Sequence, residues 1–294
     1  MTQRERKAWN AAKNRRELIE AGFGRRDLFK LGLLTSAGYM LTKGGLSARA
    51  DGSVKSPPAR SFIEPLPIPP TMVPVAALSP MPTAAPNTAA GEGRTRAHQA
   101  FPPNFSSRFA PQKLYEIHQR AGQVSVSPDL PQQTIWGYNG RTPGPTFIAH
   151  YGEPILVRNF NDLPPANQNG GFGLPSVSTH LHNGHTPSES DGFPCDFFER
   201  GQFYDHHYPN VLAGFKDTHR PDGDPNEMMS FLWYHDHRIA FTSQNVYKGL
   251  AGCYLLFDKR DTGDETTGFR FPGIPHTPPT PHEFDVPMMF GDRV

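Results

Sequence analysis

Cysteine is scarce in this chain, which has 294 residues and contains only Cys195 and Cys253. Two cysteines build neither a disulfide scaffold nor a four-cysteine zinc site, so both of these classes are excluded. Net charge is also nearly absent, because 29 lysines and arginines stand against 28 aspartates and glutamates and leave a formal charge of +1 at pH 7. The total charge therefore provides no attraction to nucleic acid or to a membrane surface.

Long apolar runs and a phosphate-binding glycine loop are missing as well. Hydrophobic residues make up 36% of the chain. The mildly apolar run at residues 31–41 is too short to cross the ~30 Å hydrocarbon core of a membrane as a helix, so no stable membrane span is expected. By contrast, the 32 prolines and 28 glycines exceed ordinary usage. This composition predicts many turns, extended segments and few long helices, and the 13 histidines are a further excess.

Residues 1–50 have the order of an export signal. A polar, basic stretch ends in Arg25 and Arg26, the mildly apolar run follows, and Ala48-Arg49-Ala50 provides small residues for cleavage. The paired arginines, followed by a Leu-Phe and a Lys, resemble a twin-arginine signal. The alternative is an amphipathic helix with a chance arginine pair. We expect cleavage after Ala50 and a periplasmic or secreted protein.

Proline dominates the next segment, residues 51–105. Such a stretch favours extended polyproline conformation and excludes a helix or a central strand. Its apolar residues predict an ordered arm near residues 61–76, whereas residues 76–93 are expected to be loose. The folded domain is therefore expected to occupy residues 106–261.

Short runs of β-branched and aromatic residues alternate with turn signals through residues 106–261. Asn139-Gly140, Pro143-Gly144 and Asn183-Gly184 are strong turn formers. This spacing predicts an all-β domain, an antiparallel β-sandwich. The strands are expected at residues 114–118, 134–138, 146–149, 155–159, 176–183, 231–235 and 252–257.

Two His-x-His pairs carry the chemistry, His180 with His182 and His235 with His237. In a strand, residues two apart project from one face about 6–7 Å apart, so the two imidazoles of a pair reach one metal or two adjacent metals. Leu181 then points into the core. Both pairs together make a four-imidazole cluster that suits copper, zinc, iron or nickel. A single pair is more often a solvated surface feature, but the apolar run before each pair and the Gly-containing turn after it favour a metal site.

The flanking segments carry a resemblance. They are Trp136 to Thr146 with Gly152 and residues 157–161, the run from His180 to Gly192, the run from Trp233 to Gly252, and residues 62–75. Together they resemble the first domain of multicopper oxidases, in particular the spore-coat laccase and bilirubin oxidase branch with its N-terminal arm. The resemblance covers residues 61–294 and implies a cupredoxin-like Greek-key sandwich.

The resemblance also implies roles for the site residues. His180 would bind the type 2 copper, His182 and His235 would bind one type 3 copper, and His237 would bind the other. Asp191 matches an acidic residue that assists proton delivery to reduced oxygen, and its alternative role is that of an Asp-Gly turn former. The implied partners are dioxygen and a small reductant, either phenol-like, pigment-like or a metal ion.

Other polar residues near the pairs are expected to be structural. Asp236 points away from the metals and would anchor the backbone. His206 and His207 would be structural or surface residues without a ligand role, and His185 would at most support a ligand. Cys195 and Cys253 could pair in an oxidising compartment, although sequence alone does not bring two cysteines within bridging distance.

The resemblance implies eight copper-binding histidines from four pairs, and a blue copper held by a His-Cys-His segment. This sequence has two pairs and no such segment. Residues 262–281 predict a linker, and residues 282–294 have the character of a second cupredoxin domain that is cut short. We therefore expect the N-terminal part of a laccase-like oxidase, inactive without a C-terminal domain or second subunit. The alternatives are a non-catalytic copper-binding or scaffold module and another histidine-metal enzyme.

Overall fold

The computed structural model describes residues 59–61, 63–98, 109–215, 223–224, 227, 230–263, 267 and 285–291. The expected export signal, its cleavage site and most of the expected linker at 262–281 lie outside these residues. The chain divides into two compact units, residues 1–64 with 127–131, and residues 65–126 with 132–294. Within the first unit, Arg60 Nη2 pairs with Asp129 Oδ1 at 2.7 Å. The second unit contains both histidine pairs and every strand of the described residues.

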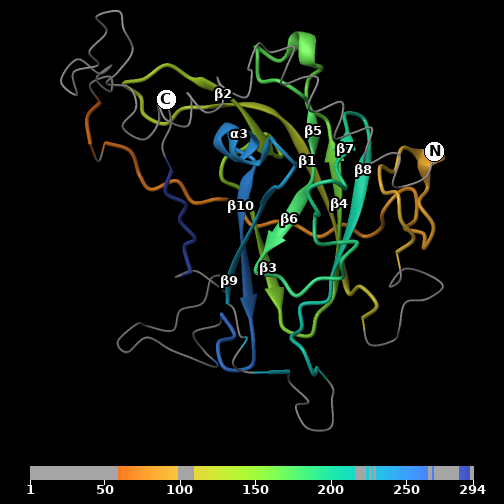
Figure 1. Ribbon diagram of the computed structural model, residues 1–294. Helices are drawn as coiled ribbons and strands as arrows, with labels where there is room; N and C mark the ends of the chain where they lie inside the picture. Colours follow the sequence, from red (N-terminus) through yellow and green to blue (C-terminus); the bar gives the residue numbers. More distant parts are fainter. Residues whose placement is uncertain are drawn as a thin grey trace, which may run out of the picture. The chain divides into compact units, whose positions relative to one another are not determined.

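Two four-stranded sheets and one short two-stranded sheet form the second unit (Figure 1). The first sheet has the order β2 (Gln133–Tyr138), β1 (Lys113–Val124), β4 (Ile155–Asn161) and β8 (Phe203–Tyr208). The second has the order β3 (Gly144–His150), β10 (Ala251–Phe257), β9 (Phe231–Asp236) and β6 (Thr179–His182). The small sheet pairs β5 (Ser176–Val177) with β7 (Phe198–Glu199). The described helices are short: η2 (Thr88–Ala90), η3 (Ala166–Gln168) and α3 (Thr242–Lys248).

The predicted all-β, cupredoxin-like sandwich is confirmed, with one difference in strand direction. β1 runs parallel to β4, and β10 runs parallel to β3, while the other strand pairs are antiparallel. Each parallel pair joins strands that are not consecutive in the chain, because the connection between them passes through other strands, as in a Greek key. Every predicted strand is present; the strands β7 and β8 and the helix α3 were not predicted.

An aromatic core fixes the position of β9, the strand that carries His235. Tyr234 lies in this core at 3% exposure and stacks edge-on against Tyr138, with ring centroids 4.6 Å apart. Its hydroxyl donates to the carbonyl of Pro145 at 2.6 Å. Gly252 of β10 leaves room for the ring, since a Cβ there would lie 2.2 Å from Tyr234 Cζ. Complete burial of a side chain of this size contributes roughly 1.5–3 kcal/mol, so this packing holds β9 firmly in place.

Residues 72–75 of the proline-rich segment pair with strands of the sandwich. Met72 N donates to Thr146 O at 2.8 Å, and Val75 N donates to Leu114 O at 2.7 Å. The expectation of a loose segment at residues 76–93 was wrong: Leu78 is 4% exposed and packs with Leu156. The amino-acid composition did not predict this order. The segment is held by single buried contacts, and it has no periodic apolar face that a sequence pattern would show. In the described parts of the chain, no helix has the length and apolar character that a membrane span requires.

Candidate metal centre

The two histidine pairs lie on neighbouring strands of one sheet. β6 carries His180 and His182, and β9 carries His235 and leads directly into His237. β6 and β9 are antiparallel, and their register places His180 opposite His235. Because alternate residues share a face, this register puts both pairs on the same side of the sheet. Leu181, between the first pair, is 2% exposed and lies in the core, as predicted.

The four imidazoles form one cluster. The ring of His180 has its centroid 5.6 Å from that of His182, 5.5 Å from that of His235 and 5.3 Å from that of His237. Ring nitrogens of His180, His182 and His235 all lie within 4.8 Å of one another. His182 Nδ1 lies 3.3 Å from His235 Nε2. The structure therefore brings together the four predicted ligands, and three of them converge closely enough to hold one ion.

Backbone carbonyls set the orientation of two rings. His180 Nδ1 donates to the carbonyl oxygen of Asp191, and His235 Nδ1 donates to that of Asp236 at 2.8 Å. A carbonyl oxygen only accepts, so each Nδ1 carries the ring proton and each Nε2 keeps a free lone pair. This is the form of histidine that binds metals, with the second ring nitrogen fixed by a hydrogen bond.

Burial favours the neutral form of two of the rings, His182 and His235. His235 is 4% exposed, and loss of hydration lowers its pKa to about 4, with a further decrease from neighbouring histidines. Burial also lowers the pKa of His182, as do the adjacent His180 and His237. A neutral imidazole is the competent ligand for a metal ion. The donor set therefore fits a metal ion of the type that prefers nitrogen ligands.

Asp236 anchors the second pair, as predicted. Its buried carboxylate accepts from the backbone amides of Ser178 at 2.8 Å and Arg238 at 3.1 Å. Asn245 Nδ2, on α3, donates to the same carboxylate at 2.9 Å. Burial raises the pKa of Asp236 to about 6, while these hydrogen bonds act in the opposite direction. The side chain thus ties β9 to the loop before β6 and to α3.

Asp191 combines a turn with an exposed carboxylate. The side chain is 46% exposed, and Oδ1 lies 3.5 Å from His180 Nδ1. Thr186 Oγ1 donates to Oδ1 at 3.0 Å. The next residue, Gly192, has a φ of +74°, and a Cβ there would lie 2.0 Å from the carbonyl oxygen of Thr179. Asp191 therefore follows the turn at residues 188–190, precedes a glycine with left-handed backbone, and places a solvent-accessible carboxylate beside a candidate ligand.

The remaining candidate residues have structural positions. His206 and His207 are buried on β8, with His206 Nδ1 accepting from Asn159 Nδ2 at 2.9 Å. They are structural and lie inside the protein. His185 is exposed and lies 3.6 Å from Glu227, outside the cluster. Cys195 and Cys253 are both free thiols, so they form no disulfide in this structure, and Cys253 is buried in β10.

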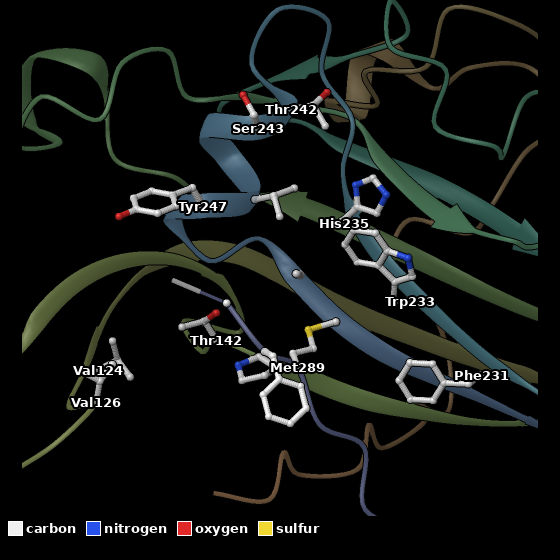
Figure 2. Close-up of a pocket in the computed structure, with 15 residues that line it drawn as sticks. Val124, Val126, Thr142, Phe231, Trp233, His235, Thr242, Ser243, Tyr247 and Met289 are labelled. Atoms are coloured by element: carbon white, nitrogen blue, oxygen red, sulfur yellow. The ribbon is translucent and has the colours of Figure 1, made fainter. Parts of the chain in front are cut away.

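Sequence reasoning missed Trp233. Its ring stacks on His235, with centroids 4.0 Å apart, and also lies 5.2 Å from the ring of His182. Figure 2 shows Trp233 beside His235 at the edge of a cavity of about 730 Å³, to which α3 contributes Thr242, Ser243 and Tyr247. Trp233 precedes His235 by two residues in a strand, so the same alternation that paired the histidines was sufficient to predict it.

Comparisons with known proteins find similar sequences. Residues 120–209 match the family described as multicopper oxidase. A laccase of Bacillus stratosphericus is 35% identical over 200 residues, which are 62% of this chain and 34% of that laccase. A bilirubin oxidase of Albifimbria verrucaria is 31% identical over 180 residues, which are 61% of this chain and 25% of that enzyme.

A laccase of Bacillus subtilis strain 168 is 32% identical over 199 residues and is matched over 33% of its length. The crystal structure of a laccase from Pediococcus acidilactici superposes with a TM-score of 0.44 at 17% identity, over 69% of this chain and 32% of that one. The chain thus spans about a third of the length of the laccases to which it is similar.

Proposed function

We propose, from the premise that the cupredoxin part of this chain belongs to the multicopper oxidase family, that its four clustered histidines bind copper in a centre that reduces dioxygen to water. The observation that carries the proposal is the cluster itself. Ring nitrogens from β6 and β9 converge within 4.8 Å. Two rings present Nε2 because carbonyls hold their Nδ1 protons.

Each of the four histidines would have its own place in the proposed copper centre. His180 would hold the type 2 copper, His182 and His235 one type 3 copper, and His237 the other. Bound copper supplies one-electron redox chemistry, which the amino acids of the site lack. The protein supplies neutral imidazoles at fixed positions. Hydrogen bonds of Asp236 and Tyr234 hold β9 in place.

Asp191 would supply protons. Its carboxylate is partly exposed to solvent and lies 3.5 Å from His180. Reduction of dioxygen to water consumes four protons. A carboxylate between solvent and the cluster would act as a general acid that delivers them. The hydrogen bond from Thr186 keeps the carboxylate at this edge of the cluster.

The complete reaction would need further ligands. The two His-x-His pairs of this sequence supply four imidazoles, whereas the proposed centre takes eight. A second cupredoxin domain would provide the other four, the blue copper and the pocket for the reductant. The reductant would be a phenol, a pigment or a metal ion, and we place the reaction in the periplasm or outside the cell.

A second candidate function is a non-catalytic copper-binding or scaffold module of the same fold. The convergence of three ring nitrogens supports it, because holding a metal ion requires only the ligands and no route for electrons. Both candidates share the copper site and differ in oxygen chemistry.

Metal analysis of the full chain after copper-replete expression tests the site. We expect bound copper in the wild type, and its loss from a His180→Ala, His235→Ala double variant. The matched control is His118→Ala, His150→Ala, since these two histidines are 40% and 45% exposed and lie outside the cluster. Zinc in place of copper, or copper retained by the first double variant, contradicts the proposal. Bound copper without oxygen uptake on an added phenol, in the chain joined to a second cupredoxin domain that supplies the remaining ligands, favours the copper-binding module.

A further inference from the structure

We infer that His98, on the proline-rich arm, is a positioning residue that fixes the ring of His180 through Ser190 and the turn leading to Asp191. His98 and Ser190 are both buried, with 1% and 0% exposure. His98 Nε2 lies 2.7 Å from Ser190 Oγ, although the two residues are 92 positions apart in the sequence. For copper, the inference rests on the function proposed above; for the orientation of His180, it stands on these contacts alone.

The contacts around Ser190 and His98 favour an arrangement in which the serine hydroxyl donates to the ring. The backbone amide of His207 donates to Ser190 Oγ at 2.8 Å. The Ser190 hydroxyl then has its own proton to donate to His98 Nε2. His98 Nδ1 carries the ring proton and lies 3.5 Å from Glu189 Oε1. Burial, with Arg94 close by, lowers the pKa of His98 to about 2, which agrees with a neutral ring that accepts from serine.

The arm around His98 is itself secured. His98 N donates to Ala84 O at 2.7 Å. Arg94 is buried, donates to Thr83 O at 2.8 Å and pairs with Glu92 at 2.6 Å. The imidazole is therefore presented to Ser190 from an ordered support, which is what a positioning contact requires.

Ser190 transmits this restraint to Asp191. Ser190 N donates to Pro187 O at 2.8 Å, closing a turn. Tyr204 donates its hydroxyl proton to Glu189 O at 3.0 Å, so the residue before Ser190 is held by β8. On the other side, Gly192 approaches the Thr179 carbonyl too closely for a side chain. The peptide between Ser190 and Gly192 therefore has little freedom, and its Asp191 carbonyl points at His180 Nδ1.

This arrangement selects the Nδ1-protonated tautomer of His180 and leaves Nε2 free toward the cluster. When the contact of His98 with Ser190 is lost, a buried hydroxyl keeps its proton without an acceptor, and the turn relaxes to satisfy it. The Asp191 carbonyl then no longer holds the ring. Loss of such supporting contacts costs roughly 10- to 100-fold in metal affinity.

Nitrogen-15 NMR of histidine side chains in the metal-free full chain reads the tautomer directly. We expect His180 to be predominantly Nδ1-protonated in the wild type and to lose this preference in His98→Leu and in Ser190→Ala. His98→Gln keeps a side-chain acceptor for Ser190 and should restore the wild-type spectrum. His118→Leu, in the other sheet, is the matched control. A wild-type His180 tautomer in folded His98→Leu and Ser190→Ala overturns the inference, as does a failure of His98→Gln to rescue.

Copper affinity, measured by competition with a chelator, separates this inference from the proposed function. We expect His98→Leu to bind copper roughly 10-fold or more weakly than the wild type, with His98→Gln close to the wild type. A wild type that binds no copper while the tautomer responds as described contradicts the proposed function and leaves the positioning role of His98 supported. Unchanged copper affinity in a variant that has lost the tautomer preference overturns the role of His98 at the metal site.

Discussion

Asp191 joins two roles at the level of a single residue, since its backbone shapes the turn and its carboxylate faces solvent beside His180. Asp191→Asn separates them. Asparagine favours the same kind of turn and still accepts from Thr186, but it no longer exchanges a proton. We expect unchanged folding and copper content. In the copper-loaded chain joined to the second cupredoxin domain that the proposed reaction needs, we expect oxygen reduction slowed by roughly 10²-fold or more.

Oxygen uptake at saturating reductant measures the effect of Asp191→Asn. Asp258→Asn provides the control, because it makes the same chemical change in a carboxylate that follows β10, outside the cluster. Equal rates for Asp191→Asn and wild type would restrict Asp191 to its part in the turn.

At the level of elements, the turn between β6 and β7 depends on a glycine for two separate reasons. Gly192 has a φ of +74°, and an added Cβ would meet the Thr179 carbonyl oxygen at 2.0 Å. Gly170 has a similar φ of +67°, but nothing lies within 4 Å of its Cβ position. Gly170→Ala should therefore cost only about 1–2 kcal/mol from the left-handed backbone. Gly192→Ala should cost more, since β6 must also move.

Urea unfolding of both glycine variants measures this difference in the free energy of unfolding. In Gly192→Ala the backbone at residue 192 must move away from β6, so the His180 ring should also lose its orientation. In Gly170→Ala the orientation of the His180 ring should stay intact. Equal losses of stability in the two variants would mean that Gly192 is needed only for its left-handed backbone. The close approach to β6 would then have no energetic effect.

The strands that were predicted from sequence share one property, a run of β-branched or aromatic residues between turn formers. β8 lacks it, because Asp205, His206 and His207 are polar and yet buried. Their burial depends on partners from other segments, such as Arg158 for Asp205 at 2.7 Å, and a single sequence does not reveal such partners. The grouping of the four histidines on one face was predictable, since alternation within a strand is local. His98 and its contact with Ser190 were not, because 92 residues separate them.

On the scale of the whole molecule, buried neutral histidines make stability depend on pH. Burial lowers the pKa of His98 to about 2 and that of His206 to about 3. Above pH 6.5 these rings are neutral in both the folded and the unfolded chain. Below pH 6.5 the unfolded chain binds protons that the folded chain refuses, so the free energy of unfolding falls by about 1.4 kcal/mol per pH unit for each such ring. This loss continues until the pH approaches the folded pKa.

Asp236 acts in the opposite direction, because its folded pKa is raised to about 6. The stabilisation that comes with its protonated form grows as the pH falls from about 6 toward its unfolded pKa, near 3.9. The total pH dependence is therefore a balance of histidines and buried carboxylates. Comparison of two proteins that differ in one ring isolates a single contribution.

His98→Gln is the suitable comparison, because glutamine keeps an acceptor for Ser190 and does not titrate. We expect similar stabilities for wild type and variant above pH 6.5, measured by urea unfolding of the metal-free chain. Between pH 6 and pH 4.5 the wild type should lose stability faster, by about 1.4 kcal/mol per pH unit. Parallel curves for the two proteins over this range would show that His98 is protonated in the folded chain as readily as in the unfolded one. The His98 ring would then be charged and could not accept the Ser190 hydroxyl proton. The arm would instead hold Ser190 through this charged ring.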